Sequence, residues 1–342
     1  MENKVSKACN SPFIIKKAKT LFQAIKKANK IAIFLHRDPD ADAVGSSLAL
    51  FWWLKKIGKR PVVFSPQKVD RSFQFLPEFK KIKMFPSNFQ QELFIFPDVA
   101  NPSLIKKNFL LPQGLKIRID HHLERSWADL ELVDPKASSV GELLVDFFQL
   151  LRQKFDQRLS FCLLTAIVGD TLNFQTPSTT AKTLKTAAFL IEQKADIAKI
   201  NNLLFNAFKF NQLKALAKIL SQAELDRKRK LVWLKIFPQD WQQLFKSGRK
   251  AAFDFLVNHL KTLPEAERYF LLSQIGKSEF RVSLRSSDLK KDVRKWAMTL
   301  GGGGHQTASG AIFKAKNFPQ ALEKVFQAFD QSFNSDDKER KP

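Results

Sequence analysis

The feature that most constrains the fold of this chain is a predicted buried strand that leads into acidic or histidine residues, which occurs three times. The run at 31–35 leads into the loop 36–46, which carries one histidine and three aspartates. The apolar run at 93–96 is followed by Pro97-Asp98, and the segment 115–119, whose residues alternate between two faces, is followed by Asp-His-His at 120–122. Because functional groups of α/β proteins gather at the carboxyl ends of parallel strands, this repetition predicts one site at one edge of a parallel sheet.

The spacing of apolar residues between these runs predicts helices that alternate with the strands. Residues 12–29 show a helical period with lysines on the opposite face, and an apolar helix is predicted at 43–57, after the first strand. A strand is predicted at 61–65, and further helices at 139–152 and 158–168. The order strand, helix, strand indicates βαβ units, so we predict an α/β fold with a parallel sheet flanked by helices.

The length of 342 residues favours two domains, because a single core seldom grows beyond ~250–300 residues. We predict an amino-terminal domain over 12–200, a helical linker over 201–226, a smaller α/β domain over 227–331 and a polar tail over 332–342. Helices are expected at 178–193, 196–224 and 290–299, with strands at 231–237, 269–275 and 280–284. Since no Gly or Pro interrupts 196–224, that helix is expected to be a semi-rigid connector between the domains.

The chain carries a formal charge of +24, which favours an anionic partner such as a nucleic acid or a nucleotide. Its 33 Phe against one Tyr point instead to a biased genome composition, under which abundant lysine needs no functional explanation. Two cysteines make neither a disulfide framework nor a zinc motif. No run reaches the ~18–20 apolar residues of a membrane span and no secretory signal is recognisable, so we expect a cytoplasmic protein without a membrane partner.

The residues at the strand ends, together with the segment Gly169-Asp170-Thr171, supply carboxylate oxygens and imidazole nitrogens but no thiolate. This set suits Mn²⁺ or Mg²⁺ better than structural zinc. Four carboxylates would balance two divalent cations, and two such ions ~3.5–4 Å apart can share a bridging carboxylate and clamp a phosphoryl group. The candidate metal ligands are His36, Asp40, Asp42, Asp98, His121 and Asp170.

The triplet Asp120-His121-His122 places two imidazoles and a carboxylate together, a combination that is costly to desolvate without a cation. Asp120 is expected to orient a neighbouring imidazole rather than to bind a metal itself. Adjacent side chains at a strand end point in different directions. We therefore expect His121 and His122 to have different roles.

A run of four glycines at 301–304 is followed by His305 and later by Gly310. Consecutive glycines let backbone N–H groups approach an anion closely, and a helix N-terminus at the run would add positive potential. A flexible linker is the alternative explanation of a glycine run. Because apolar elements flank this run on both sides, we predict an anion-binding loop.

Taken in order, these motifs resemble those of DHH-family phosphoesterases of the two-domain type with a carboxyl-terminal DHHA1 domain. The resemblance covers roughly residues 12–330. It implies that 12–200 is the DHH catalytic domain and that 227–331 is the DHHA1 substrate-binding domain. The segments that carry it are 36–46, Asp98, 120–122, 169–171 and 301–310.

In that family the site holds two Mn²⁺ ions, and the resemblance implies ligands for each. His36, Asp40 and Asp98 would surround one ion. The other would be held by Asp42, Asp98, His121 and Asp170, with Asp98 bridging. His122 matches the position that contacts the scissile phosphate, so His122 and Asp120 are the implied catalytic residues. The implied substrate-binding residues are Arg281, Arg285, Ser286, Gly302, Gly303, Gly304 and His305.

The resemblance implies a Mn²⁺-dependent hydrolase of phosphoester bonds, in which water activated by two metals attacks phosphorus. The branch it resembles, bifunctional oligoribonucleases and pAp phosphatases, acts on short RNA, dinucleotides and 3′-phosphoadenosine 5′-phosphate, and a homodimer is a further expectation. The enzyme alternatives are a RecJ-like single-strand exonuclease, a cyclic or linear dinucleotide phosphodiesterase and an exopolyphosphatase. The alternative of another class is an inactive nucleic-acid-binding protein. Departures from the family pattern at Asp38, around Asp98 and at Leu172 remove no ligand.

Overall fold

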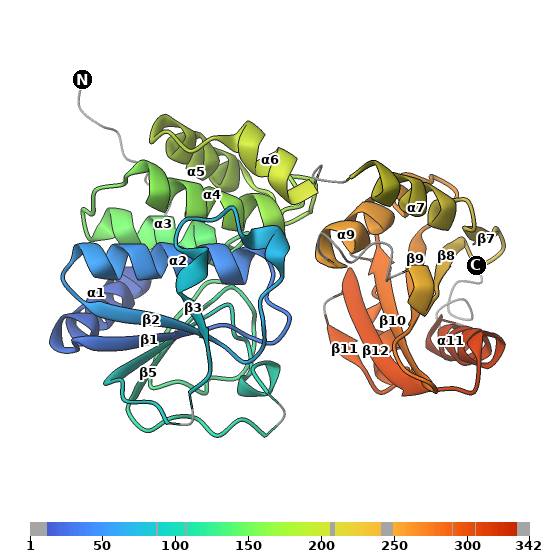
Figure 1. Cartoon of the computed structure of the whole chain (residues 1–342), viewed down its shortest axis with the longest axis horizontal. Coiled ribbons are helices and arrows are strands. Elements are labelled where there is room, and N and C mark those ends of the chain that lie inside the picture. The colour runs from blue at the N-terminus through green and yellow to red at the C-terminus, as the bar shows by residue number, and fades with distance from the viewer. Residues whose placement is uncertain are drawn as a thin grey trace, which may run out of the picture. The chain divides into compact units, whose positions relative to one another are not determined.

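The computed structural model describes residues 12–86, 88–106, 108–205, 209–240, 249–288, 290–304 and 306–333. The chain divides into two compact units, one that ends at Asn206 and one that begins at Ala207. Each unit contains a six-stranded sheet with helices packed on it (Figure 1). The predicted α/β class is confirmed, while the predicted limits of domains and linker stay a prediction.

The sheet of the first unit is parallel throughout, as predicted. Its strands lie in the order β3-β2-β1-β4-β5-β6, so the strand order reverses between β1 and β4. The short strands β3 and β6 were not predicted, because three or four residues are too few to show a period of two. The strands are β1 (Lys30–Phe34), β2 (Arg60–Ser65), β3 (Ile82–Met84), β4 (Leu93–Pro97), β5 (Leu115–Asp120) and β6 (Leu130–Val133).

The two faces of this sheet bury different side chains. Ile31 and Ile33 of β1 point into the large apolar core beneath the helices, whereas Ala32 and Phe34 point into a smaller phenylalanine-rich cluster on the other face. This alternation explains why the strands appear as continuous apolar runs in the sequence. The helices of the unit are α1 (Pro12–Lys27), α2 (Ala41–Lys56), α3 (Val140–Leu150), α4 (Gln157–Asp170), α5 (Ala181–Glu192) and α6 (Ile197–Phe205), with short 3-10 helices η2 (Arg71–Phe73), η3 (Phe79–Lys81) and η4 (Pro102–Leu104).

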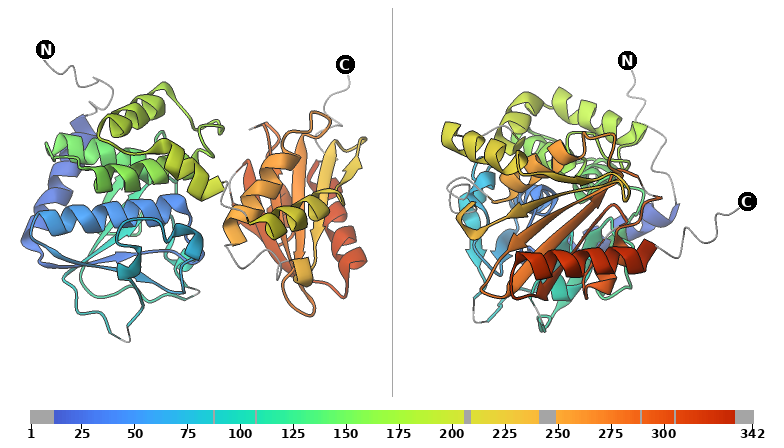
Figure 2. Two further views of the ribbon diagram at one scale, coloured as in Figure 1. Left: turned by 45° about the horizontal axis from the view of Figure 1, so that its top comes forward. Right: turned by 90° about the vertical axis from the view of Figure 1, so that its right-hand side faces the viewer.

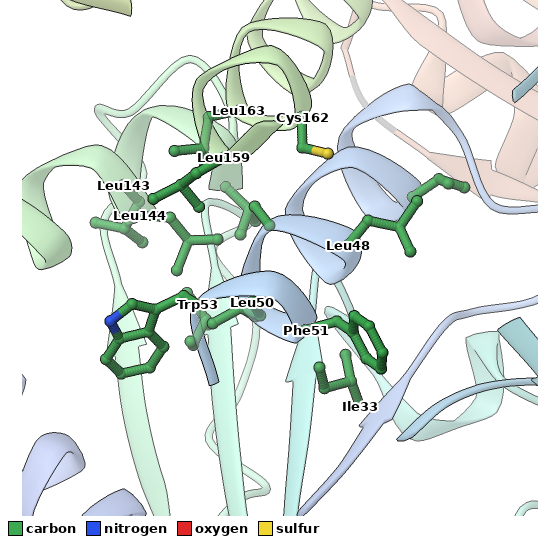
Figure 3. Packing of buried hydrophobic residues seen from close by; sticks show 14 of the residues in the cluster. Ile33, Leu48, Leu50, Phe51, Trp53, Leu143, Leu144, Leu159, Cys162 and Leu163 are labelled. Carbon is green, nitrogen blue, oxygen red and sulfur yellow. The ribbon is translucent and has the colours of Figure 1, made fainter. Parts of the chain in front are cut away.

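Helix α2 lies between the sheet and helices α3 and α4, and Figure 3 shows Leu48 and Trp53 of α2 with side chains of both neighbouring helices. The contact with α4 depends on Gly45, since a Cβ at this position would lie 2.7 Å from the carbonyl oxygen of Cys162. Close packing of α2 on α4 therefore requires a glycine here. This packing brings the amino end of α2 near the carboxyl end of α4, where Asp42 and Asp170 lie.

The second unit has a mixed sheet in the order β11-β12-β10-β9-β8-β7, in which only β8 and β9 pair in parallel among the described strands. Helices α7 and α9 cover one face. Helices α10 and α11 cover the other, where α11 lies along the sheet (Figure 2, red). The elements are α7 (Phe210–Leu220), β7 (Glu224–Asp226), β8 (Leu231–Ile236), α9 (Arg249–Leu260), β9 (Arg268–Gln274), β10 (Glu279–Ser286), α10 (Arg294–Thr299), β11 (Gly303–Gly304), β12 (Ala308–Lys314) and α11 (Phe318–Phe333).

The prediction of a single helix over 196–224 is wrong. The segment contains α6, α7 and the first residue of β7 instead. Leu204 of α6 packs into the core of the first unit, whereas Leu216 of α7 packs into a core of the second, so burial against two different cores overrides helical propensity. Most of the predicted polar tail, residues 334–342, lies outside the described residues. No helix in the described part of the chain is long and apolar enough to cross a membrane.

Candidate metal centre

The candidate ligands lie where the strand order of the first sheet reverses. His36 follows β1, Asp98 follows β4 directly, and His121 follows β5. In open α/β sheets the carboxyl ends of the strands at such a reversal form the common ligand-binding site. The sheet therefore collects groups from segments as far apart in sequence as the loop after β1 and the end of α4.

Three groups of possible metal ligands have donor atoms within 4.8 Å of one another. Asp98 belongs to two of them, and so does His121. The groups are His36, Asp40 and Asp98; Asp42, His121 and Asp170; and Asp98, Asp120, His121 and His122. The structure thus gathers all six predicted ligands into adjoining groups, with Asp98 shared.

The distances between donor atoms fit a shared cation better than direct hydrogen bonds. His36 Nε2 lies 3.5 Å from Asp98 Oδ2, and His121 Nε2 lies 3.8 Å from Asp98 Oδ1 and 3.6 Å from Asp170 Oδ2. Hydrogen bonds between such atoms are shorter, at ~2.7–3.2 Å. Two atoms bound to one octahedral cation at ~2.0–2.1 Å lie about 3 Å apart as neighbours and about 4 Å apart on opposite sides, a range that includes the observed separations.

Asp98 shows most clearly that a cation would fit. Its side chain is 6% exposed, and its Oδ1 has no hydrogen-bond partner among the described residues. Burial, followed by the charge of Asp40, raises the pKa of Asp98 well above its usual value. Its backbone adopts the left-handed conformation with φ +56°, which is uncommon outside glycine and occurs where a site needs it. A divalent cation would satisfy the orphaned oxygen and offset the repulsion.

Two of the carboxylates also hold the ends of helices. Asp40 is the N-cap of α2 and accepts the backbone N–H of Ala43 at 3.0 Å. Asp42 accepts the N–H groups of Val140 and Gly141, at 2.7 and 2.9 Å, from the first turn of α3. Sequence reasoning missed this second role of Asp42, because α3 begins nearly a hundred residues later. Burial and the charges of Asp98, Asp170 and Asp40 raise the pKa of Asp42 despite these bonds.

Asp170, the last residue of α4, reaches the cluster because a glycine precedes it. A Cβ at Gly169 would lie 2.2 Å from the Cβ of Ala41, at the start of α2. Only a residue without a side chain lets α4 approach α2 this closely. Gly169 therefore allows the close contact between the two helices, and Asp170, the candidate ligand, directly follows it.

Asp120 makes hydrogen bonds to both neighbouring histidines. Its Oδ1 accepts the backbone N–H groups of His121 and His122 and the Nδ1 of His122, the last at 2.7 Å. The predicted orienting role of Asp120 remains a proposal, and these bonds support it. The expected divergence of the two imidazoles is wrong: their ring centroids lie 4.3 Å apart, because the chain bends around Asp120. Both approach Asp98 Oδ1, His121 through Nε2 at 3.8 Å and His122 through Nδ1 at 3.4 Å, and they differ in the shorter contact of His122 with Asp120.

Arg118 is the site residue that sequence reasoning missed. It is fully buried on β5, and its Nε and one terminal nitrogen each lie 3.0 Å from Asp120 Oδ2. The same terminal nitrogen donates to the carbonyl oxygen of His122 at 2.9 Å. The available signal was an arginine inside an apolar strand with an acid two residues later, because positions i and i+2 of a strand share a face.

The environment of His122 favours its charged form. Burial alone would lower its pKa, but the hydrogen bond to Asp120 and the charges of Asp98, Asp120 and Asp170 outweigh burial and raise it to about 9. Burial would likewise raise the pKa of Asp120, yet the bond to His122 and the charges of His122 and Arg118 hold it below its usual value. The two residues form a charge-assisted pair, supported from behind by Arg118.

These shifts predict how the metal-free protein responds to pH. With its pKa raised from 6.5 to about 9, His122 contributes stability that is complete below 6.5 and lost as the pH rises through 9. The raised pKa values of Asp42 and Asp98 act in the same direction, because the folded state binds these protons more tightly. We expect the melting temperature of chelator-treated protein to fall between pH 6.5 and pH 9, as measured by circular dichroism.

Saturating Mn²⁺ should raise the melting temperature and reduce this pH dependence, because the cations take the place of the bound protons. At a free metal concentration ~100 times the Kd, the gain is about 2.7 kcal/mol, or roughly 5–10 °C. Asp98→Asn is the matched variant and should lose most of this gain. A wild-type protein that gains nothing from Mn²⁺, or that melts equally at both pH values without metal, would contradict the expectation.

In the second unit, the structure brings Arg281 and Arg285 to one face of β10 but turns Ser286 to the other. The burial pattern of β10 alternates, with both arginines on the more exposed side and Ser286 buried. The Ser286 hydroxyl donates to the carbonyl oxygen of Asp288 at 2.9 Å and accepts its N–H at 3.1 Å. These bonds give Ser286 a role in stabilising the turn, and its predicted contact with substrate stays a prediction.

The glycine run lies at the end of a helix, so the prediction of a helix N-terminus is wrong. Helix α10 ends before Gly301, whose φ is +76°. The N–H of Gly302 donates a hydrogen bond to the carbonyl oxygen of Ala297. Gly303 and Gly304 form β11, the edge strand beside β12. A Cβ at Gly302 would lie 2.1 Å from the carbonyl oxygen of Gly310, so the glycine is needed for close packing. His305 lies outside the described residues.

Two family models match the chain. Residues 30–168 match the DHH family, N-terminal domain, and residues 243–331 match the DHHA1 domain. The first match contains every candidate metal ligand except Asp170, which lies two residues beyond it. The second contains Arg281 and Arg285.

Relatives align with the chain over most of its length. The bifunctional oligoribonuclease and PAP phosphatase NrnA of Thermus thermophilus is 29% identical over 305 residues, covering 87% of this chain and 88% of that protein. The NrnA of Bacillus subtilis is 28% identical over 297 residues, covering 85% and 91%. An exopolyphosphatase-related protein from Bacteroides fragilis has a similar structure, with a TM-score of 0.83 at 21% identity, covering 92% of this chain and 96% of that one. The similarity to the Bacteroides fragilis structure shows that the two chains share a fold.

Proposed function

We propose, from the matches of residues 30–168 to the DHH family and of residues 243–331 to the DHHA1 domain, that this chain is a metal-dependent phosphoesterase that hydrolyses short oligonucleotides and 3′-phosphoadenosine 5′-phosphate. The observation that carries the proposal is Asp98, a buried carboxylate shared by two groups of ligands and left with an orphaned oxygen. The NrnA relatives support the choice of substrates. A cytoplasmic location and a homodimer stay predictions.

The residues of the centre divide into two ligand sets around Asp98. We propose that His36, Asp40 and Asp98 hold one divalent cation. Asp42, Asp98, His121 and Asp170 would hold a second. Carboxylate and imidazole ligands without a thiolate favour Mn²⁺, with Mg²⁺ as the alternative. When bound, such ions polarise a phosphoryl group and lower the pKa of an attacking water.

His122 and Asp120 would act on the substrate side of the centre. Asp120 accepts a hydrogen bond from Nδ1 of His122, which fixes the orientation of the ring and presents Nε2 as the atom to contact a phosphate oxygen. The hydrogen bond to the Asp120 carboxylate favours the protonated imidazole, so Nε2 can donate to the phosphate or to the leaving oxygen. Arg118 stabilises the Asp120 carboxylate from the buried side.

A panel of substrates tests the proposal. We expect purified protein with Mn²⁺ to hydrolyse pApA, pAp and a five-nucleotide RNA faster than long single-stranded DNA, a cyclic dinucleotide or polyphosphate. Chelation should abolish activity, and Mn²⁺ should restore it best. Degradation of a long oligonucleotide faster per enzyme than hydrolysis of pApA would reject the short-substrate proposal in favour of a RecJ-like exonuclease. Absence of turnover on every substrate would favour an inactive nucleic-acid-binding protein.

Arg285 provides a second test, in the DHHA1 domain. It is half-buried on β10 with its guanidinium 5.4 Å from the ring centre of Phe253, an arrangement that would suit a phosphate or a base. Hydrogen bonds to charged groups contribute about 1.5–3 kcal/mol, so Arg285→Ala should raise the KM for pApA by about 10- to 100-fold. Metal content should be unchanged. Lys316→Ala, an exposed cation after β12, is the control, and an equal effect of both changes would contradict the role of Arg285.

A further inference from the structure

The first unit contains a basic hollow of about 590 Å³ at the ends of β2 and β3, which we call the β2–β3 pocket. Its wall carries four exposed cationic side chains and two carboxamides: Lys68, Arg71, Lys80, Lys83, Gln67 and Gln74. None of the four cations forms an ion pair with a carboxylate of the described residues. The pocket therefore concentrates positive charge that the protein itself does not neutralise.

The β2–β3 pocket begins one strand away from the metal centre. Strands β1 and β2 pair in parallel, and the N–H of Leu35, next to His36, donates to the carbonyl oxygen of Phe64 at 2.9 Å. Neighbouring strands lie ~4.8 Å apart. Gln67 of the pocket wall also donates from Nε2 to Asp38 Oδ1 at 2.6 Å, and Asp38 belongs to the same loop as His36. Gln67 therefore connects the pocket to the loop that carries His36.

The chemistry of the pocket suits a nucleotide rather than a bare anion. Lysine and arginine side chains around one hollow bind phosphate oxygens and release counterions. Phe79 and Met84 also line it, and Met84 is 55% exposed, so an apolar surface lies beside the cations. A phosphate next to a flat base meets such a combination of charge and apolar surface in proteins that bind single strands.

We propose that the β2–β3 pocket binds the phosphodiester and base of a nucleotide beyond the scissile one, so that oligonucleotides longer than a dinucleotide gain an additional contact. This inference rests on the proposed function, because it takes the scissile phosphate to lie at the metal centre. It names the substrate class that the pocket selects: single-stranded oligonucleotides of more than two nucleotides. On this proposal a dinucleotide or pAp is held at the metal centre alone, and only a further nucleotide occupies the pocket.

The double variant Lys80→Ala/Lys83→Ala tests the pocket, with Lys16→Ala/Lys19→Ala as the matched control. Lys16 and Lys19 are also exposed and line a hollow of about 380 Å³, but on α1, which packs against β6 at the opposite edge of the sheet. Both variants remove two positive charges. Binding of a labelled five-nucleotide RNA is measured by fluorescence anisotropy in chelator, which prevents turnover, at several salt concentrations. The KM values for five-nucleotide RNA and for pAp are then measured with Mn²⁺.

We expect the pocket variant to raise the Kd of five-nucleotide RNA by about tenfold and to lower the slope of log Kd against log salt by about 1 for each lysine in contact. The KM for pAp should be unchanged, and the control should behave as wild type. Equal changes in the Kd of RNA in both double variants, or an equal rise in the KM for pAp and for RNA, would overturn the proposal. A wild-type protein that hydrolyses no substrate would contradict the proposed function. If its RNA binding still depended on Lys80 and Lys83, that result would support RNA binding at the β2–β3 pocket.

Discussion

Asp98→Ala is expected to lower kcat/KM for pApA by more than about 100-fold, because changes to residues behind metal ligands already cost 10–100-fold and Asp98 is proposed to be a ligand of both ions. No other candidate ligand is shared with the His36 and Asp40 set. Its loss would therefore weaken both cation sites at once. Metal content, measured by inductively coupled plasma mass spectrometry, should fall together with activity.

Loss of folding is distinguished from loss of the site by a second variant. Asp98→Asn keeps the size of the side chain and suits the left-handed backbone of this position, which asparagine tolerates better than most residues. Because the Asp98 carboxylate is buried among like charges, removing its charge should leave the metal-free protein as stable as wild type or more so. Glu192→Gln, at the exposed end of α5, is the control for charge. Full activity in Asp98→Ala would refute the two-metal centre.

His122→Ala should lower kcat by about 10²–10⁴-fold, the range typical of a lost general acid or base, while the protein keeps its metal. The structure gives different partners to the two histidines. Both lie near Asp98, but His121 Nε2 lies 3.6 Å from Asp170, whereas Nδ1 of His122 is bound to Asp120 at 2.7 Å. His121→Ala should therefore lose metal as well as turnover.

The comparison is made on variants purified side by side, with metal stoichiometry and single-turnover rates as the two measurements. His259→Ala, which removes an exposed histidine of the second unit, is the control and should retain both. Arg118→Met provides a further comparison, since it would remove the buried partner of Asp120 and should lower kcat without loss of metal. Equal metal loss in His121→Ala and His122→Ala would contradict the assigned roles.

The sequence by itself determined strands β1, β2, β4 and β5 of the first unit and the positions of the candidate ligands that follow three of them. The segments before His36, Asp98 and Asp120 each form a strand of the parallel sheet. Strands β1 and β4 could be predicted because they are continuous apolar segments, β5 because its residues alternate, and the site because the functional groups of a parallel sheet follow its strands. These features are local, so they can be recognised within a short stretch of residues.

The tertiary structure alone decided the contacts between segments that lie far apart in the chain. Asp42 holds the first turn of α3, Gly169 fits against Ala41, and the ends of β2 and β3 enclose the basic pocket. No local pattern marks these partners, because they depend on which elements become neighbours in the sheet. The buried Arg118 had a local signal, an acid at i+2, but its contact with His122 requires the bend after β5.

In the second unit, the tertiary structure also corrected predictions that local patterns had favoured. The glycine run lies after α10 rather than before a helix, since Gly302 must pack against Gly310 of β12. The predicted connector became two helices, because α6 and α7 bury apolar side chains in different cores. Helical propensity and glycine content describe what a segment tolerates, whereas the surfaces available for burial determine where it packs.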